Sequence, residues 1–499
     1  MTKIAVIGAG FSGLSAAAYL SEAGHEVHVF EKNETAGGRA RQLETNEGYL
    51  FDMGPSWYWM PDVFERFFND FGYETSDWYS LKLLDPSFDV VLAGGRKMSI
   101  PTDYAQLRDL FEKTEPGSAD RLDSFMQEAR HKYEAAMENL VYMPGNSMFE
   151  FVDSKILKQA LSLQIFSSFS KHIRKFFSHP DLIALMEFPV LFLGAMPQQS
   201  PALYSLMNYA GLKLGTWYPM NGGFGRVVQS IVSICENQSV SFHFNSAVDK
   251  IKVQQNLARS IIVDGIELDF DAIIASADYH HVEEHLLPKE YKNYDQTYWQ
   301  KKTFAPSSLI FYVGLSKKIP NIRHHTLFFE EALYEHSVEI YKSPSWPAKP
   351  LFYVCCPSQS DSTVAPEGHE NLFFLMPVAP GLTDDAQTRE KYFAIMIKRL
   401  ENYLGEDLQD FIDYKSSYCI NDFISDYNAY KGNAYGLANT LRQTAFLKPK
   451  IRNKKVRNLF YAGQLTVPGP GVPPSLISGK IASNELLKYL KSKKHEVNI

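Results

Sequence analysis

The sequence predicts an α/β protein in which a Rossmann-like three-layer domain is interleaved with an α+β domain made of a mixed sheet and helices. Three observations predict this class. A strand, a glycine-rich turn, a helix and a second strand open the chain, and a strand, a Gly/Pro-rich loop and a helix end it. Between them, several apolar strands follow one another with too little helix for a purely parallel sheet.

Composition narrows the possible functions. The 499 residues carry a formal net charge of −7, which argues against a protein that binds nucleic acid by neutralising phosphates. The four cysteines are too few for a disulfide scaffold and have no paired zinc spacing, so we expect a reducing, cytoplasmic location and no metal site. Aromatic residues make up 14%, which fits either a well-filled core or a large apolar cavity or membrane-facing surface lined by Phe and Tyr.

The first element is a strand over Ile4–Ile7, followed at once by Gly8-x-Gly10-x-x-Gly13, a helix over Leu14–Ala23 and a strand over Glu26–Glu31. The glycines allow a tight turn, close approach of a pyrophosphate and close helix–strand packing, and the helix N-terminus attracts phosphate. Glu31 can accept hydrogen bonds from ribose hydroxyls and disfavours a 2′-phosphate. The pattern predicts a dinucleotide site for FAD or NAD rather than NADP.

A helix is expected from Pro61, with Asp62 as N-cap and Glu65 completing a capping box. The region from about 83 to 214 is predicted to be mainly helical. Within it, Lys155–Phe177 combines apolar residues at helical spacing with five basic residues. Such a helix suits a membrane surface, and an ordinary packed helix with a solvated basic face is the alternative.

Later segments again show the strand and helix patterns of the N-terminal region. Strands are expected at 240–244, 248–253, 261–263 and 272–276, and mixed-sheet strands at 309–315, 351–356 and 372–378. A helix over 387–404 should end at Gly405, and Leu459–Ala462 and Ser475–Leu490 should form the last strand and helix. We therefore assign 1–82, 215–290 and 420–499 to a discontinuous dinucleotide-binding domain, and 83–214 and 291–419 to a substrate-binding, membrane-associating domain.

Two further motifs favour a flavin. Thr35–Arg41 (TAGGRAR) places two glycines and Arg39 after the ribose acid, where Arg39 can reach a phosphate or the flavin unless it is only a surface charge. Prolines and glycines between Pro468 and Pro474 fix a rigid loop that can lie against a planar ligand. The helix after this loop is either simply a capped terminal helix or aimed at N1 and O2 of a flavin, stabilising the anion formed on reduction.

These motifs together resemble a known family. VIGAGFSGL, the Glu31 strand end, AGGRA, FDMGP and YAGQLTVPGPGVPPSLISG are similar to the carotenoid desaturases of the phytoene desaturase type, within the flavin amine oxidase superfamily. Inner stretches extend the resemblance: YPMNGGFGRVVQSI, IIASADYHHV and GNAYGL. The C-terminal run departs from the commonest form at Gln464-Leu465 and Pro470, which leaves the particular carotenoid open.

The resemblance implies an FAD-binding Rossmann-like domain and an FAD-dependent carotenoid desaturase, in which hydride passes from an allylic carbon to flavin N5 and a proton is lost. It also implies an apolar substrate tunnel, oxygen or a membrane quinone as electron acceptor, and peripheral membrane association. The residues expected to contact FAD are Gly8, Gly10, Phe11, Ser12, Gly13, Glu31, Lys32, Gly38, Arg39, Gly54, Pro55, Val248, Gly463, Gly471, Val472 and Pro473.

No catalytic base can be named from the sequence. Asp52 lies near the Gly54-Pro55 turn, but a loop-capping acid is the favoured interpretation. A hydroxycarotenoid 3,4-desaturase, a carotenoid isomerase, a flavin amine oxidase and a non-enzymatic prenyl-lipid escort protein stay open as alternatives.

Three other groups invite a functional interpretation. His281 and His285 are expected to be solvated loop residues rather than metal ligands, and Cys355-Cys356 to be core. The basic stretch Lys448–Arg457 fits anionic lipid headgroups or a solvated loop equally well.

Overall fold

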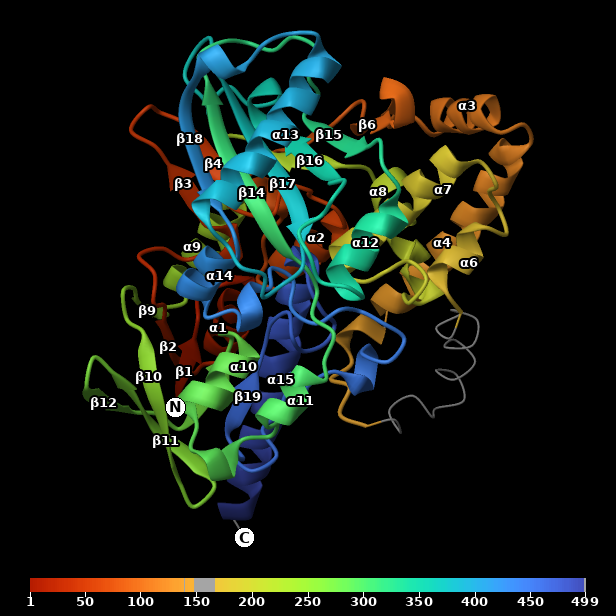
Figure 1. Cartoon of the computed structure of the whole chain (residues 1–499). Helices are drawn as coiled ribbons and strands as arrows, with labels where there is room; N and C mark the ends of the chain where they lie inside the picture. Colours follow the sequence, from red (N-terminus) through yellow and green to blue (C-terminus); the bar gives the residue numbers. More distant parts are fainter. Residues whose placement is uncertain (139, 148–166, 498–499) are drawn as a thin grey trace.

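A computed structural model describes residues 1–138, 140–147 and 167–497 (Figure 1). A parallel sheet at the base holds both ends of the chain, with strand order β19-β13-β1-β2-β9. Its strands are β1 (Lys3–Ile7), β2 (Glu26–Phe30), β9 (Ser241–His243), β13 (Ala272–Ala275) and β19 (Leu459–Tyr461). The predicted Rossmann-like sheet is confirmed.

Alternate residues of β1 face opposite layers. Ile4 and Val6 lie in one core with the helices α1 (Phe11–Glu22), α9 (Phe224–Asn237) and α15 (Val472–Val497). Ala5 and Ile7 lie in another core, beneath a three-stranded antiparallel sheet. That sheet consists of β10 (Val248–Gln254), β11 (Leu257–Val263) and β12 (Ile266–Asp269). Helices, parallel sheet and antiparallel sheet thus form three layers.

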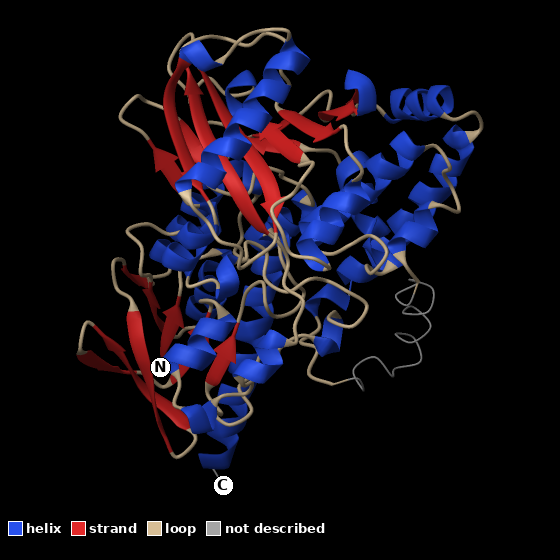
Figure 2. Ribbon diagram, in the orientation of Figure 1, coloured by secondary structure: helices blue, strands red, loops and turns tan. Residues whose placement is uncertain are grey.

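A second, mixed sheet lies above the first, with order β18-β14-β17-β16-β15-β6-β7 (Figure 2). Its strands are β6 (Phe88–Leu92), β7 (Arg96–Ile100), β14 (Ser307–Leu315), β15 (His325–Phe329), β16 (Phe352–Cys355), β17 (Glu370–Val378) and β18 (Ile412–Tyr418). Helix α13 (Ala386–Leu404) covers one face and ends at Gly405 in the left-handed conformation, as predicted. The opposite face of this sheet, which α13 does not cover, lines the cavity described below.

The described part of the region from 83 to 214 is mainly helical, as predicted, but it also contributes two strands. Its helices are α3 (Tyr104–Thr114), α4 (Ser118–Glu138), α6 (Phe169–Ile173), α7 (Pro180–Glu187) and α8 (Leu206–Leu212). However, β6 and β7 form an antiparallel pair at the edge of the mixed sheet, and β6 runs parallel to β15. The two strands form a local hairpin through Gly94-Gly95, which was not predicted, and only the pairing of β6 with β15 joins segments more than 200 residues apart.

Several helices and strands have not yet been named. They are α2 (Pro61–Asn69), α10 (Tyr279–His281), α11 (Gln296–Gln300), α12 (Leu333–Tyr341), α14 (Ile420–Tyr427), the hairpin β3 (Gln42–Glu44) and β4 (Leu50–Asp52), and the pair β5 (Leu81–Leu83) and β8 (Trp217–Pro219). None of the helices in the described part of the chain has the length and apolarity needed to span a membrane.

Two local predictions need correction. Met60, not Asp62, is the N-cap of α2, and no capping box forms, because Asp62 instead accepts a hydrogen bond from Tyr133 Oη at 2.6 Å. Most of the predicted helix over Lys155–Phe177 lies outside the described residues. Of its described part, α6 buries Phe169 and Ile173 and leaves Lys171 exposed.

Candidate cofactor and substrate site

One cavity of about 650 Å³ runs between the two sheets. Its walls combine residues from the glycine-rich turn after β1, from the loop before α15, and from the face of the mixed sheet opposite α13. The size is within the range of about 300–1,000 Å³ usual for small-molecule sites. The cavity has a polar half at the parallel sheet and an apolar half at the mixed sheet.

The polar half begins at the N-terminus of α1. Gly10 is the N-cap of this helix, and no side chain caps it, so the first helical N–H groups stay available to a ligand in the cavity. Gly38 lies against Gly10, since a Cβ on Gly38 would be 3.1 Å from Gly10 Cα. The two glycine motifs of the sequence therefore meet at one place and form an anion-binding site.

Glu31 links the second strand to this turn. One carboxylate oxygen accepts a hydrogen bond from Ala9 N at 2.8 Å, and the other accepts from Asn33 N at 3.0 Å. Both bonds hold the carboxylate at the cavity wall, which it lines. In this position Glu31 can still accept from hydroxyl groups, because an ionised carboxylate has about four acceptor positions.

Arg39 and Asp278 face the same half. The guanidinium of Arg39 lies over the Tyr427 ring at 4.9 Å and donates to Asn433 O at 3.3 Å. Its Nε and Asp278 Oδ2 are buried without hydrogen-bond partners among the described residues. Burial lowers the pKa of Arg39 and raises the pKa of Asp278. Two orphaned buried polar groups in a cavity indicate that a polar ligand completes them.

The C-terminal loop closes the opposite side. Helix α15 begins at Val472, three residues earlier than predicted, with Pro473 and Pro474 in its first turn, where their missing N–H costs nothing. Gly471 O accepts from Ser475 N at 3.0 Å. The helix N-terminus lines the cavity and carries partial positive charge.

The residues present fit FAD. Helix N-termini for phosphate, a carboxylate for ribose and a flat Gly/Pro loop lie around one cavity, and two buried polar atoms there lack partners. Of the predicted contacts, all but Gly13 line the cavity: Gly8, Gly10, Phe11, Ser12, Glu31, Lys32, Gly38, Arg39, Gly54, Pro55, Val248, Gly463, Gly471, Val472 and Pro473. Gly13 lies behind the turn, where its missing side chain lets α1 approach Gly8.

The apolar half follows the alternation of the mixed sheet. Ile310, Leu327, Phe329 and Leu375 face the cavity, whereas their neighbours in sequence pack against α13. Leu375 is half-buried although β17 lies between β14 and β16, because its side chain faces this cavity. Trp57, Trp59, Phe188, Met207 and Ile340 complete the wall. Among the described lining residues, those from the mixed sheet carry no charge.

Sequence reasoning missed several of these residues. Trp57, Tyr353 and Tyr435 line the cavity, and Tyr353 Oη donates to Ser56 Oγ at 3.0 Å. The only local signal was the position of Ser56 and Trp57 directly after the Gly54-Pro55 turn. The tyrosines come from elements that pair only in the folded chain.

Asp52 is a structural cap, as favoured, but it caps the start of helix α9 and not a loop. Its carboxylate accepts from Phe224 N at 2.9 Å and from Gly225 N at 3.3 Å, at the start of α9. Burial raises the pKa of Asp52 to about 7, although these two bonds act against the rise. Asp52 does not line the cavity, so it is not placed to take a proton from a substrate there.

One interpretation of polar side chains was partly wrong and another was confirmed. His281 and His285 are not loop residues, because His281 ends α10 and His285 lies in the helical turn that follows. Both line the cavity, and His285 is exposed to solvent, as expected. Burial lowers the pKa of His281 to about 4. Cys355 and Cys356 are core residues, as predicted, with exposed fractions of 1% and 0%.

Only part of the basic stretch Lys448–Arg457 lies on the surface of the protein. Lys454 and Lys455 are exposed, but Lys448 is 2% exposed and its Nζ has no hydrogen-bond partner among the described residues. Burial lowers the pKa of Lys448 from 10.5 to about 7. Lipid headgroups therefore cannot reach this lysine.

This burial predicts a pH effect on stability. Between pH 7 and about 10.5 the unfolded chain binds the Lys448 proton and the folded chain does not, so the free energy of unfolding should rise with pH, by up to about 1.4 kcal/mol per pH unit. Lys448→Met should flatten this rise, and Lys454→Met, on the surface, should leave it intact. Thermal unfolding of the three proteins at pH 7 and 9 measures the effect. Identical pH dependence in all three would contradict it.

Comparison with known proteins agrees with this geometry. Residues 11–487 match the family model described as flavin containing amine oxidoreductase. The chain is 39% identical to the carotenoid 3,4-desaturase of Haloarcula japonica, over 97% of this chain and 98% of that protein. It is 29% identical to the zeta-carotene-forming phytoene desaturase of Myxococcus xanthus, over 98% of this chain and 94% of that protein.

A solved structure shows the same fold. Cyclohexylamine oxidase from Brevibacterium oxydans superposes with a TM-score of 0.61 over 98% of this chain and 99% of that one, at 13% sequence identity. The chain therefore belongs to the flavin containing amine oxidoreductase family, and its cofactor is FAD.

Proposed function

We propose that the protein is an FAD-dependent carotenoid desaturase that introduces C=C bonds into an acyclic or monocyclic carotenoid. The observation that carries this proposal is the single cavity that joins the FAD-type glycine motifs to an uncharged apolar wall. A carotenoid is a long hydrocarbon with almost nothing to hydrogen-bond, so its binding free energy comes from apolar burial, at about 25 cal/mol per Å². The similarity to two carotenoid desaturases supports the same substrate class.

FAD supplies the acceptor for a hydride from an allylic carbon, while a proton leaves the neighbouring carbon. The chain's own residues bind the cofactor and orient the substrate. With FAD bound, the first turn of α1 and Arg39 would hold the phosphates, Glu31 would hold the ribose, and the backbone at Val248 would lie at the adenine. The start of α15, at Val472, would place its partial positive charge at the flavin and would favour flavin reduction. Leu327, Leu375 and their neighbours keep water away and set the substrate's position.

A 3,4-desaturase is the second candidate, because the relative with that activity is 39% identical whereas the phytoene desaturase is 29% identical. An amine oxidase shares the fold, but the lining residues of the mixed sheet offer a cationic amine no charged partner. The two desaturase reactions differ in where the bond forms and not in the chemistry required of the site.

We assign the two sheets to two domains: 1–82, 215–290 and 420–499 around the parallel sheet, and 83–214 and 291–419 around the mixed sheet, an assignment that the membership of their strands supports. The protein associates peripherally with a membrane, where its substrate is dissolved and a quinone, or oxygen, reoxidises the flavin. Exposed Leu441 and Leu447, near the exposed Arg442, support a surface of this kind. Flotation with anionic liposomes tests it: protein that stays at the bottom of the gradient contradicts membrane association.

Expression in a host that accumulates a chosen carotenoid tests the activity. Strains that make phytoene, other acyclic carotenoids, hydroxylated acyclic carotenoids or monocyclic carotenoids are compared by chromatography with and without the protein. We expect at least one strain to gain a product with a longer conjugated system. Unchanged pigments in every strain, with FAD bound to the purified protein, would reject the proposal.

A further inference from the structure

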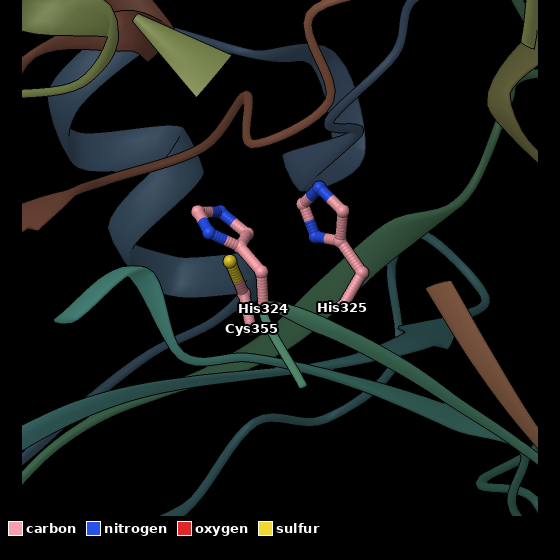
Figure 3. A group of neighbouring side chains, drawn as sticks. All are labelled: His324, His325 and Cys355. Carbon is pink, nitrogen blue, oxygen red and sulfur yellow. The ribbon is translucent and has the colours of Figure 1, made fainter. Parts of the chain in front are cut away.

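Three side chains of known metal-binding chemistry lie together at the end of the mixed sheet, away from the glycine motifs. One ring nitrogen of His324, one ring nitrogen of His325 and Cys355 Sγ all lie within 4.8 Å of one another. His325 and Cys355 face each other across β15 and β16, and His324 precedes β15. Figure 3 shows the three side chains on the same side of these strands. This is the His/Cys cluster.

The cluster is closed to solvent. The exposed fractions are 6% for His324, 0% for His325 and 1% for Cys355. Neutral imidazole is the form that binds metals.

Each histidine has one nitrogen occupied and one free. His324 Nδ1 is 2.8 Å from Ser360 Oγ, and His325 Nδ1 is 2.6 Å from Tyr353 Oη. The Nε2 atoms of both histidines are buried and have no hydrogen-bond partner among the described residues. Two orphaned nitrogens side by side are unusual, because buried polar atoms nearly always have a partner.

The hydrogen bonds at Nδ1 are of the kind that orients a metal ligand. Tyr353 Oη donates to Ser56 Oγ at 3.0 Å, which leaves the phenol oxygen to accept from His325 Nδ1–H. A proton on Nδ1 places the lone pair on Nε2. Histidines that ligate a metal through one nitrogen regularly bond a second group through the other, as both do here.

From this geometry we propose that His324 Nε2, His325 Nε2 and Cys355 Sγ form a buried site for one thiophilic transition-metal ion, Cu(I) rather than Zn²⁺. Binding breaks the S–H bond of Cys355, forms a metal–sulfur bond and releases one proton to solvent. No oxidation or reduction takes place. With metal–nitrogen bonds of about 2.0–2.1 Å and a metal–sulfur bond of about 2.3 Å, as for zinc, the three donors close in around one ion from their present separation of at most 4.8 Å.

Charge favours the monovalent ion. Cu⁺ with one thiolate and two neutral imidazoles is uncharged, whereas Zn²⁺ in the same ligands carries one positive charge that these ligands do not neutralise. Zinc also prefers four ligands, and the described residues supply a group of three. Thiolate is a soft ligand that selects Cu(I) among the common ions.

The site would fix one wall of the substrate half of the cavity. The His325 ring stacks on Trp57 with ring centroids 4.1 Å apart, and its Nδ1 partner Tyr353 lies beside it on β16. Trp57 and Tyr353 both line the cavity. A bound ion therefore stabilises the positions of two lining residues without contacting the flavin or the substrate.

Metal analysis of the purified FAD-bound protein tests the proposal. The protein is incubated under reducing conditions with Cu(I), or with Zn²⁺, then desalted and measured by mass spectrometry of the metals. Cys355→Ala is compared with Cys356→Ala, a matched control, because Cys356 is the next residue, is equally buried and points to the opposite face with Ser358. Flavin absorbance reports that each variant is folded.

We expect one copper per chain in the wild-type protein and in Cys356→Ala, and at least a tenfold lower copper content in Cys355→Ala. X-ray absorption at the copper edge of the wild-type protein should show one sulfur and two nitrogen neighbours, and this measurement requires no variant. Retention of zinc alone would overturn the copper assignment. Retention of neither metal, or equal copper in both variants, would overturn the site. None of these readouts depends on desaturase activity.

Discussion

Gly13→Ala is expected to produce a protein that holds almost no FAD and has a melting temperature lower by about 5 °C or more. A Cβ at this position would lie 1.9 Å from Gly8 O, and the clashing atom is backbone in the turn that the cofactor needs. Overpacking of this kind costs about 1–3 kcal/mol even where side chains can move. Here the carbonyl can move only with the turn, so both stability and binding fall.

Gly10→Ala is the matched comparison. Gly10 has φ −74°, which any residue adopts, and the nearest atom to an added Cβ is Gly38 Cα at 3.9 Å. The apoprotein should therefore keep the wild-type melting temperature. The methyl group would enter the cavity beside the expected phosphates, and FAD affinity should fall about tenfold or more, at a cost of about 1.4 kcal/mol.

Both variants are measured by the ratio of flavin absorbance to protein and by calorimetry of the apoproteins. Full FAD content and normal stability of Gly13→Ala would show that the first turn is not packed as described. A normal FAD content for Gly10→Ala would show that the phosphates do not bind at the N-terminus of α1.

Leu375→Trp should abolish most of the desaturase activity while leaving FAD in place. Leu375 projects from the centre of the mixed sheet into the apolar half, opposite Tyr353 on β16. An indole there narrows the space available to a rigid polyene. Because small misplacements of a reacting carbon cost about a hundredfold in rate, we expect a loss of at least that size.

A control with the same added ring separates blocking from general damage. Ile266→Trp places the indole on β12, where the residue is 62% exposed, and should retain wild-type activity. Product formation per bound flavin is measured for each protein. If Leu375→Trp desaturates at the wild-type rate, the apolar half of this cavity is not the substrate site.

The polar half of the site could be predicted from sequence because the residues that form it lie close together in short sequence motifs. Gly8, Gly10 and Gly13 lie within six residues, and the strand that ends at Glu31 follows directly. Arg39 and the loop before α15 were found for the same reason, since each lies within a short Gly-rich or Pro-rich motif. The structure brings all of these residues to one cavity except Gly13, which supports it from behind.

The apolar half could not be predicted in the same way. Its wall depends on the register between β14, β15, β16 and β17, and the sequence between these strands does not fix which face turns inward. The hairpin β6–β7 was missed although its turn at Gly94-Gly95 is local. Its attachment to the mixed sheet could not be predicted, because β15, the partner of β6, is more than 200 residues away. The burial of Lys448 depends on tertiary contacts that a run of basic residues does not reveal.

The most direct measurement is the reduction of the bound flavin by substrate. The purified protein with FAD is mixed without oxygen with an acyclic carotenoid in detergent micelles, and the visible spectrum is followed. We predict that the oxidised-flavin absorbance disappears while a carotenoid with a longer conjugated system forms in equal amount. A flavin that stays oxidised with every carotenoid offered, yet is reduced by dithionite, would contradict the assignment as a carotenoid desaturase.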